Sequence, residues 1–205
     1  MSPEVLWALV ALGFAVVAVR RRTLGIALLA GQSLLLGALA IAHAEGAPGE
    51  LALAVVILLA RGVVLPGLLL WVVRGTREPR RVASERFVLH RLVVAVGAVA
   101  VAAALVPALP LDDPGAEHVV IALLVQGIVI AAVRRAVVFQ AVGFLVAENG
   151  VYLAGLTVAG GVPGALELAL LFDLLAVLAV AAAFGSRIHE RFGSSDTGLL
   201  RGLRD

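Results

Sequence analysis

Seven long runs of apolar residues constrain the fold of this chain more than any other feature. Each run holds 16 to 23 residues, and an α-helix of about 20 residues spans the hydrocarbon core of a bilayer. Within lipid the backbone must satisfy its own hydrogen bonds, so such runs form helices. Because 62% of the residues are hydrophobic, we expect an all-α, polytopic transmembrane bundle. The expected spans cover residues 4–19, 24–43, 51–73, 87–109, 118–133, 136–158 and 164–184.

Two of these runs, 4–19 and 118–133, are short for a membrane crossing. The run 118–133 must still cross, because an acidic connection precedes it and the pair Arg134 and Arg135 follows it. The run 4–19 has no such constraint and could lie in the membrane interface. We therefore expect seven spans and keep six as an alternative.

Basic residues fall almost entirely on one side of the expected bundle. Connections that carry Arg alternate with connections that lack it, so fifteen of the sixteen basic residues share one side and Arg61 is the exception. The positive-inside rule makes that side cytoplasmic. It predicts a cytoplasmic C-terminus and, if the run 4–19 crosses, an N-terminus outside. We expect the membrane to be a bacterial or archaeal plasma membrane. The basic residues are not gathered on one face with aromatic residues, so they indicate orientation in lipid rather than nucleic-acid binding.

We expect one integral membrane domain over residues 1–205, with two parts and a tail. Residues 1–82 hold three of the expected helices, residues 83–185 hold four, and residues 186–205 form a polar cytoplasmic tail. The segments AGQSLLLGALAIAHAEGAPGELAL and AENGVYLAGLTVAGGVPGALELAL, which are 117 residues apart, resemble each other. They predict a parallel internal repeat, although the abundance of Ala and Leu allows a chance match.

Three ionisable residues, Arg61, Glu148 and Asp173, lie near the middle of three separate apolar runs. A charge at the centre of a bilayer costs roughly 2.5 to 3.5 kcal/mol, so such side chains face the bundle interior, a partner or water. A structural ion pair is one interpretation. Two acids and one base, however, leave one carboxylate over, and a carboxylate in a low-dielectric interior can exchange protons near neutrality. Glu148 and Asp173 are therefore candidates for a proton path, and Arg61 for tuning their charge.

Four amides inside the spans, Gln32, Gln126, Gln140 and Asn149, are candidates for polar support of that path. Their simpler role is hydrogen bonding between helices, worth about 1 kcal/mol each. Pro66 follows Arg61 by five residues and is expected to free a backbone carbonyl and kink the helix.

Catalytic signatures are missing from the sequence. It has no Cys, and therefore no thiolate nucleophile or Cys-ligated iron-sulfur cluster. None of the four His residues has the spacing of a metal site, and there is no phosphate-binding loop or dinucleotide motif. We expect no catalytic centre, metal or cofactor in this chain.

The segment 134–205 resembles the membrane subunit called hydrogenase-4 component E, which is similar to the small K subunit of respiratory complex I. The resemblance rests on AENGVYLAGL with Glu148, on ELALLFDLLAVLAV with Asp173, and on the tail FGSSDTGLLRGLRD. It implies that these two acids belong to a proton path. In RGVVLP the family tends to have Lys where this chain has Arg61, and Arg holds its proton more firmly than Lys.

The resemblance implies an accessory membrane subunit of an oxidoreductase assembly like complex I or a group 4 hydrogenase. Its expected partners are membrane lipid, antiporter-type and other membrane subunits, and a peripheral redox module that carries the cofactors. A subunit of a multi-subunit cation/proton antiporter would use the same buried carboxylates without redox chemistry. A structural assembly subunit with inert buried charges is the third alternative.

Overall fold

The fold is known from a computed structural model of the full chain. It describes residues 2–43, 48–75, 88–107 and 113–158, together with a few isolated residues. Asp173, the expected last span and the expected tail lie outside the described residues.

Every element in the described part of the chain is a helix. These elements are α1 (Pro3–Ala18), α2 (Arg22–His43), α3 (Pro48–Leu59), η1 (Ala60–Val64), α4 (Leu65–Gly75), α5 (Val88–Leu105), α6 (Pro114–Val133) and α7 (Val137–Thr157). The helix η1 is a short π-helix that joins α3 and α4 into one continuous rod.

Within the described residues, five stretches are long and apolar enough to cross a membrane, and α1, with 16 residues, is shorter. Large apolar side chains such as Trp7, Trp71, Leu89 and Leu105 are exposed on the outside of the bundle, as expected where lipid rather than water surrounds a protein. The expectation of a multi-pass helical protein agrees with these helices.

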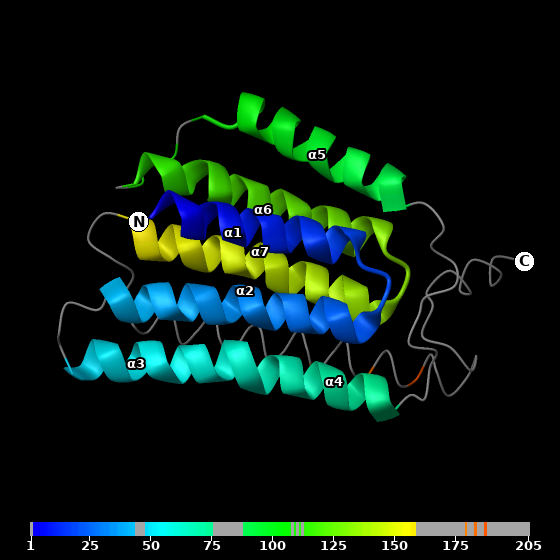
Figure 1. The fold of residues 1–205 in the computed structure, drawn as a ribbon, viewed down its shortest axis with the longest axis horizontal. Coiled ribbons are helices and arrows are strands. Elements are labelled where there is room, and N and C mark those ends of the chain that lie inside the picture. Colours follow the sequence, from blue (N-terminus) through cyan, green and yellow to red (C-terminus); the bar gives the residue numbers. More distant parts are fainter. Residues whose placement is uncertain are drawn as a thin grey trace, which may run out of the picture.

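Successive rods run in opposite directions, so the connections gather at two ends of the bundle (Figure 1). Apart from Arg61 and Glu148, which lie near the middles of their helices, basic residues gather at one end of the described helices and acidic residues at the other. The basic end holds Arg20, Arg21, Arg22, Arg74, Arg91, Arg134 and Arg135, and the acidic end holds Glu4, Asp113 and Glu117. Asp113 is the N-cap residue of α6, and its carboxylate accepts a hydrogen bond from the Gly115 N–H at 2.8 Å.

Among the described helices, α6 and α7 pack most closely, and glycines allow it. A Cβ at Gly127 would overlap backbone atoms of Gly143 and Ala147, and a Cβ at Gly143 would lie 2.6 Å from the Ala131 N. At Gly150 a Cβ would lie 3.1 Å from the Leu124 N. The two backbones are therefore in direct contact, as small residues permit in membrane helices.

The π-turn keeps one face of the α3–η1–α4 rod against α2. Ala54 and Ile57 on α3 are buried, as are Leu65, Leu69 and Val73 on α4. Ala54 and Val73 are nineteen residues apart, so at about 100° per residue an unbroken α-helix would leave them about 100° out of line. The additional residue in the π-turn removes that mismatch.

The expected effect of Pro66 has a specific form in the structure. The N–H of Leu65 bonds to the carbonyl of Ala60, which is the i to i−5 pattern of a π-helix. Pro66 has no N–H to continue the ladder. The irregularity predicted at Pro66 is thus a widened turn directly before it, and Arg61 lies within that turn.

Candidate functional site

Arg61 and Glu148, predicted separately as buried charges, meet in the structure as an ion pair. The Arg61 Nη2 atom lies 3.0 Å from the Glu148 Oε1 atom, and both side chains are largely buried. Arg61 comes from the π-turn and Glu148 from the middle of α7. Pairing offsets the roughly 2.5 to 3.5 kcal/mol that each charge would cost alone in a bilayer. Of the two alternative acids, Glu148 is the one seen with Arg61, and Asp173 lies outside the described residues.

A network of amide and hydroxyl groups extends from this pair into the bundle. Asn149 is the centre of the network: its Oδ1 accepts from Arg61 Nη2 at 3.5 Å and from Ser33 Oγ at 3.4 Å. The Asn149 Nδ2 donates to Gln32 Oε1 at 2.9 Å. Gln32 Nε2 in turn donates to the backbone carbonyl of Leu9 at 2.9 Å. The network therefore links four parts of the bundle, which are the α3–η1–α4 rod, α7, α2 and α1.

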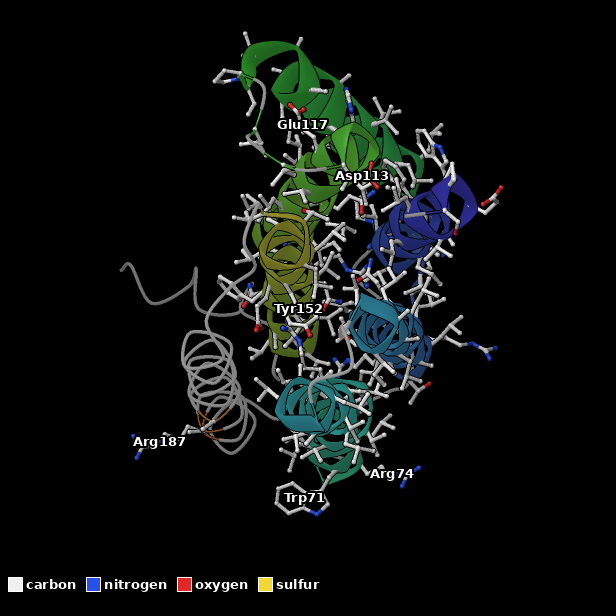
Figure 2. All side chains as sticks on the ribbon, turned by 90° about the vertical axis from the view of Figure 1, so that its left-hand side faces the viewer. Trp71, Arg74, Asp113, Glu117, Tyr152 and Arg187 are labelled. Carbon is white, nitrogen blue, oxygen red and sulfur yellow. The ribbon has the colours of Figure 1, made fainter. Side chains whose placement is uncertain are left out.

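Tyr152 is the aromatic partner of Arg61. The guanidinium carbon of Arg61 lies 4.6 Å from the centre of the Tyr152 ring, within range of a cation–π interaction. Figure 2, a view along the helices, shows Tyr152 on the inner side of α7, whereas Trp71 and Arg74 of α4 point out of the bundle. Arg61 is thus held by a carboxylate, an amide oxygen and an aromatic ring.

Sequence reasoning missed Tyr152 and Ser33. Tyr152 is the one tyrosine in the chain and lies four residues after Glu148, a spacing that puts two side chains on the same face of a helix. That spacing was an available signal. Ser33 had a weaker one, its position next to Gln32 in the chain.

The remaining two predicted amides do not contact the pair. Gln126 on α6 donates through Nε2 to the Val10 carbonyl on α1 at 3.2 Å, and its side chain fits against Gly13. Gln140 donates to the Arg134 carbonyl at 3.1 Å, at the connection between α6 and α7. Gln126 fits the simpler interpretation of an interhelical hydrogen bond, and Gln140 closes a turn.

Arg134 shows that some basic residues do more than mark orientation. It is 1% exposed, and its Nη1 donates to the carbonyls of Val17 at 3.3 Å and Val19 at 2.8 Å. Its guanidinium also lies over the Phe139 ring. Because the last carbonyls of a helix lack partners within it, Arg134 caps the end of α1. Sequence reasoning had assigned it only to a connection.

The described residues form no group of three His, Cys, Asp or Glu side chains that could hold a metal. The chemistry that the Arg61 and Glu148 pair can support is proton exchange and charge compensation. Glu148 can bind and release a proton, whereas Arg61 keeps its charge. The arrangement thus combines one exchangeable group with one fixed charge.

Comparisons with known proteins give one informative similarity. The chain is 28% identical over 160 residues to the uncharacterized protein Rv0085 of Mycobacterium tuberculosis. The alignment covers 76% of this chain and 73% of that protein. No family model matches the chain. No solved structure matches it either.

Proposed function

We propose that this chain is a non-catalytic membrane subunit of an assembly like complex I or a group 4 hydrogenase, in which Glu148 contributes to a proton path. The observation that carries the proposal is the buried pair of Arg61 and Glu148 between apolar helices. Ionisable groups at this depth are expensive and are commonly functional. Redox chemistry and its cofactors belong, in this proposal, to partner subunits.

The surroundings of Glu148 support exchange of its proton. Arg61 is also held by Asn149 and Tyr152, so its charge keeps two partners when Glu148 is neutral. A site that relied on Glu148 alone would leave a buried cation uncompensated each time the acid took up a proton. Asp173 is the proposed second acid of the path, as the resemblance of the segment 134–205 to hydrogenase-4 component E implies.

The proposal includes an orientation for the seven expected spans. The basic end of the bundle faces the cytoplasm and the acidic end faces out, by the positive-inside rule. His118 near the acidic end and Arg74 at the basic end are both exposed. An impermeant thiol reagent added to intact cells should therefore label His118→Cys and not Arg74→Cys. The reverse pattern would contradict the orientation.

Two other functions use the same residues. A subunit of a multi-subunit cation/proton antiporter would need the exchangeable acid without a redox module, and neighbouring genes for antiporter subunits alone would favour it. A structural role is favoured by the number of partners around Arg61, since a fully paired charge can simply hold helices in register.

Proton uptake by membrane vesicles during turnover of the whole complex distinguishes the proton path from the structural role. Glu148→Gln keeps the shape of the side chain and removes its exchangeable proton. We expect the variant to assemble and to lose most proton uptake, normalised to assembled complex on a native gel. Glu148→Asp, which keeps the carboxylate, is the matched control and should lose less. Wild-type uptake by the double variant Glu148→Gln, Asp173→Asn would leave these residues as structural charges.

A further inference from the structure

The α3–η1–α4 rod is attached to the bundle in two different ways. Along its length it packs on α2, through buried residues such as Ile57 on α3 and Leu69 on α4. At its centre Arg61 reaches α7, where it contacts Glu148, Asn149 and Tyr152. The apolar contacts do not depend on charge. The contact with Glu148 does, because a neutral carboxylic acid attracts a guanidinium far less than a carboxylate does.

The residue that makes this charge-dependent contact lies inside the one π-turn of the described chain. A π-turn holds one more residue than the α-helix allows, and it often marks a functional site. Conversion of this turn to an α-helix would rotate α4 against α3 by about 100°, the twist of one residue. The rod can therefore change shape at the same place where it senses the charge of Glu148.

The surroundings of the turn allow such a change. Gly62 is buried against α2, and the atom nearest to the position of a Cβ is the end of the Leu34 side chain, Cδ2 at 2.5 Å, with the Leu34 Cα at 3.8 Å. At Gly67, one residue beyond Pro66, a Cβ would have no atom within 4 Å. Pro66 has no backbone N–H in either form, so a change of the turn breaks no hydrogen bond donated from that position.

We propose that the π-turn is a hinge, at which α4 moves relative to α3 when Glu148 loses its negative charge. The proposal deepens the proposed function, since it rests on a change in the charge of Glu148. The part that moves is α4, which belongs to the same rod as Arg61, the residue with the fixed charge. The close-packed α6 and α7 remain still.

Glu148 forms its ion pair with Arg61 at 3.0 Å. Arg61 approaches from η1, and Tyr152 lies on the same helix as Glu148. In α2 and α6, which pack on α7, the ionisable residues are at the helix ends: Arg22 and His43 on α2, and Glu117 and His118 on α6. Near their middles α2 and α6 offer the uncharged Gln32, Ser33 and Gln126. Replacement of Glu148 by Gln is therefore a specific test of its charge.

Distances between pairs of spin labels can test the hinge in the full-length chain in lipid nanodiscs. The sequence contains no Cys, so introduced cysteines are labelled without interference. Trp71 on α4, Val56 on α3 and Phe144 on α7 are exposed. The pair Trp71→Cys with Phe144→Cys reports on α4, and the pair Val56→Cys with Phe144→Cys is the matched control on α3.

We expect Glu148→Gln to shift the α4 to α7 distance by several ångström and to leave the α3 to α7 distance unchanged. Arg61→Gln, which breaks the pair from the other side, should give the same pattern. If a variant does not purify, the same cysteine pairs can be cross-linked in native membranes with thiol reagents of graded length. Equal distances with and without the charge would overturn the hinge, and so would equal shifts at α3 and α4.

Deletion of Val63 gives the sharpest control. The deletion removes the additional residue, so the turn can become α-helical. Ala54 and Val73 would then be eighteen positions apart, which is about five full turns. They would therefore stay on the same face of the rod. The Glu148→Gln substitution should then move neither pair of labels. A shift of α4 that persists in the deletion variant would show that the π-turn is not the hinge.

The hinge and the proposed proton path can fail separately. Movement of α4 together with wild-type proton uptake by Glu148→Gln would keep the hinge and reject the path. Loss of proton uptake without movement of α4 would keep the path and reject the hinge.

Discussion

The 117-residue offset of the predicted repeat, carried over to the hairpins α1–α2 and α6–α7, pairs positions that are packed in different ways. Gly127 and Gly143, where the α6 and α7 backbones touch, correspond by this offset to the buried Val10 and Ile26. The α1–α2 hairpin therefore has large side chains where the α6–α7 hairpin has direct backbone contact. Glu148, the acid of α7, corresponds to Gly31.

This difference suggests a division of roles between the two hairpins. A carboxylate held on a close-packed hairpin stays in place when its charge changes, because cores packed on backbone contacts deform little. The α1–α2 hairpin instead supplies neutral polar partners, Gln32 and Ser33, which meet Asn149 across the interface between α2 and α7. Gln32 and Asn149 are themselves equivalent positions of the predicted repeat. The repeat stays a prediction, and their hydrogen bond joins its two copies.

The largest expected effect comes from Arg61→Ala, which removes the basic partner of Glu148 on the α6–α7 hairpin. Breaking one partner of a buried ion pair costs about 3 to 5 kcal/mol. We expect a strong loss of folded protein, measured by size-exclusion chromatography and by the melting temperature in detergent. The double variant Arg61→Ala, Glu148→Gln should recover much of the loss. Equal losses in the single and double variants would show that Arg61 acts through packing rather than charge.

The next largest effect should come from Gly127→Val, which gives α6 the residue that α1 has 117 positions earlier, Val10. The new side chain meets backbone atoms of Gly143 and Ala147, which cannot rotate away. Overpacking typically costs about 1 to 3 kcal/mol, and we expect the upper part of that range in thermal unfolding. Gly31→Ala is the control, since a Cβ there has no atom within 4 Å. A melting temperature lowered equally by both substitutions would contradict the contrast between the hairpins.

Part of this arrangement could be predicted from sequence, because it depends on local composition. Apolar runs determine the helices, and the alternation of Arg determines which ends meet. The choice of Glu148 as the partner of Arg61 depends on how η1 and α7 are placed by α2, and two acids were open alternatives. The π-turn arises from a mismatch between buried positions as distant as Ala54 and Val73. Such a mismatch becomes visible only when the packing surface is known.

Buried Arg134 shows the same limit. Its sequence context, a short connection between two apolar runs, is that of an orientation signal, and its helix-capping bonds go to residues on α1. A contact between residues 117 positions apart has no local signature. Tyr152 was easier to predict from sequence, because it lies only four residues after Glu148 on the same helix.

A smaller effect should follow from Tyr152→Leu, which gives α7 the residue found at the equivalent position of α2, Leu35. The substitution removes the aromatic ring beneath Arg61. A cation–π interaction contributes about 0.5 to 2 kcal/mol, with the larger values where the cation is desolvated. We expect a loss of that size in thermal unfolding, with Tyr152→Phe retaining most of the stability because it keeps the ring. If Phe and Leu destabilise equally, the hydroxyl group rather than the ring supports Arg61.

The smallest effect is expected for Asn149→Gln, which makes the two equivalent polar positions identical. Gln keeps the amide donor and acceptor that bond Gln32, Ser33 and Arg61, and it adds one methylene to the side chain. Hydrogen bonds between membrane helices contribute about 0.6 kcal/mol on average, so the loss should stay below about 1 kcal/mol. Asn149→Leu removes the amide and should cost more, with a coupling to Gln32→Leu in a double-mutant cycle. An Asn149→Gln variant as unstable as Asn149→Leu would mean that the network requires the shorter side chain of Asn. The Gln found at position 32 of α2 could then not replace Asn149 on α7.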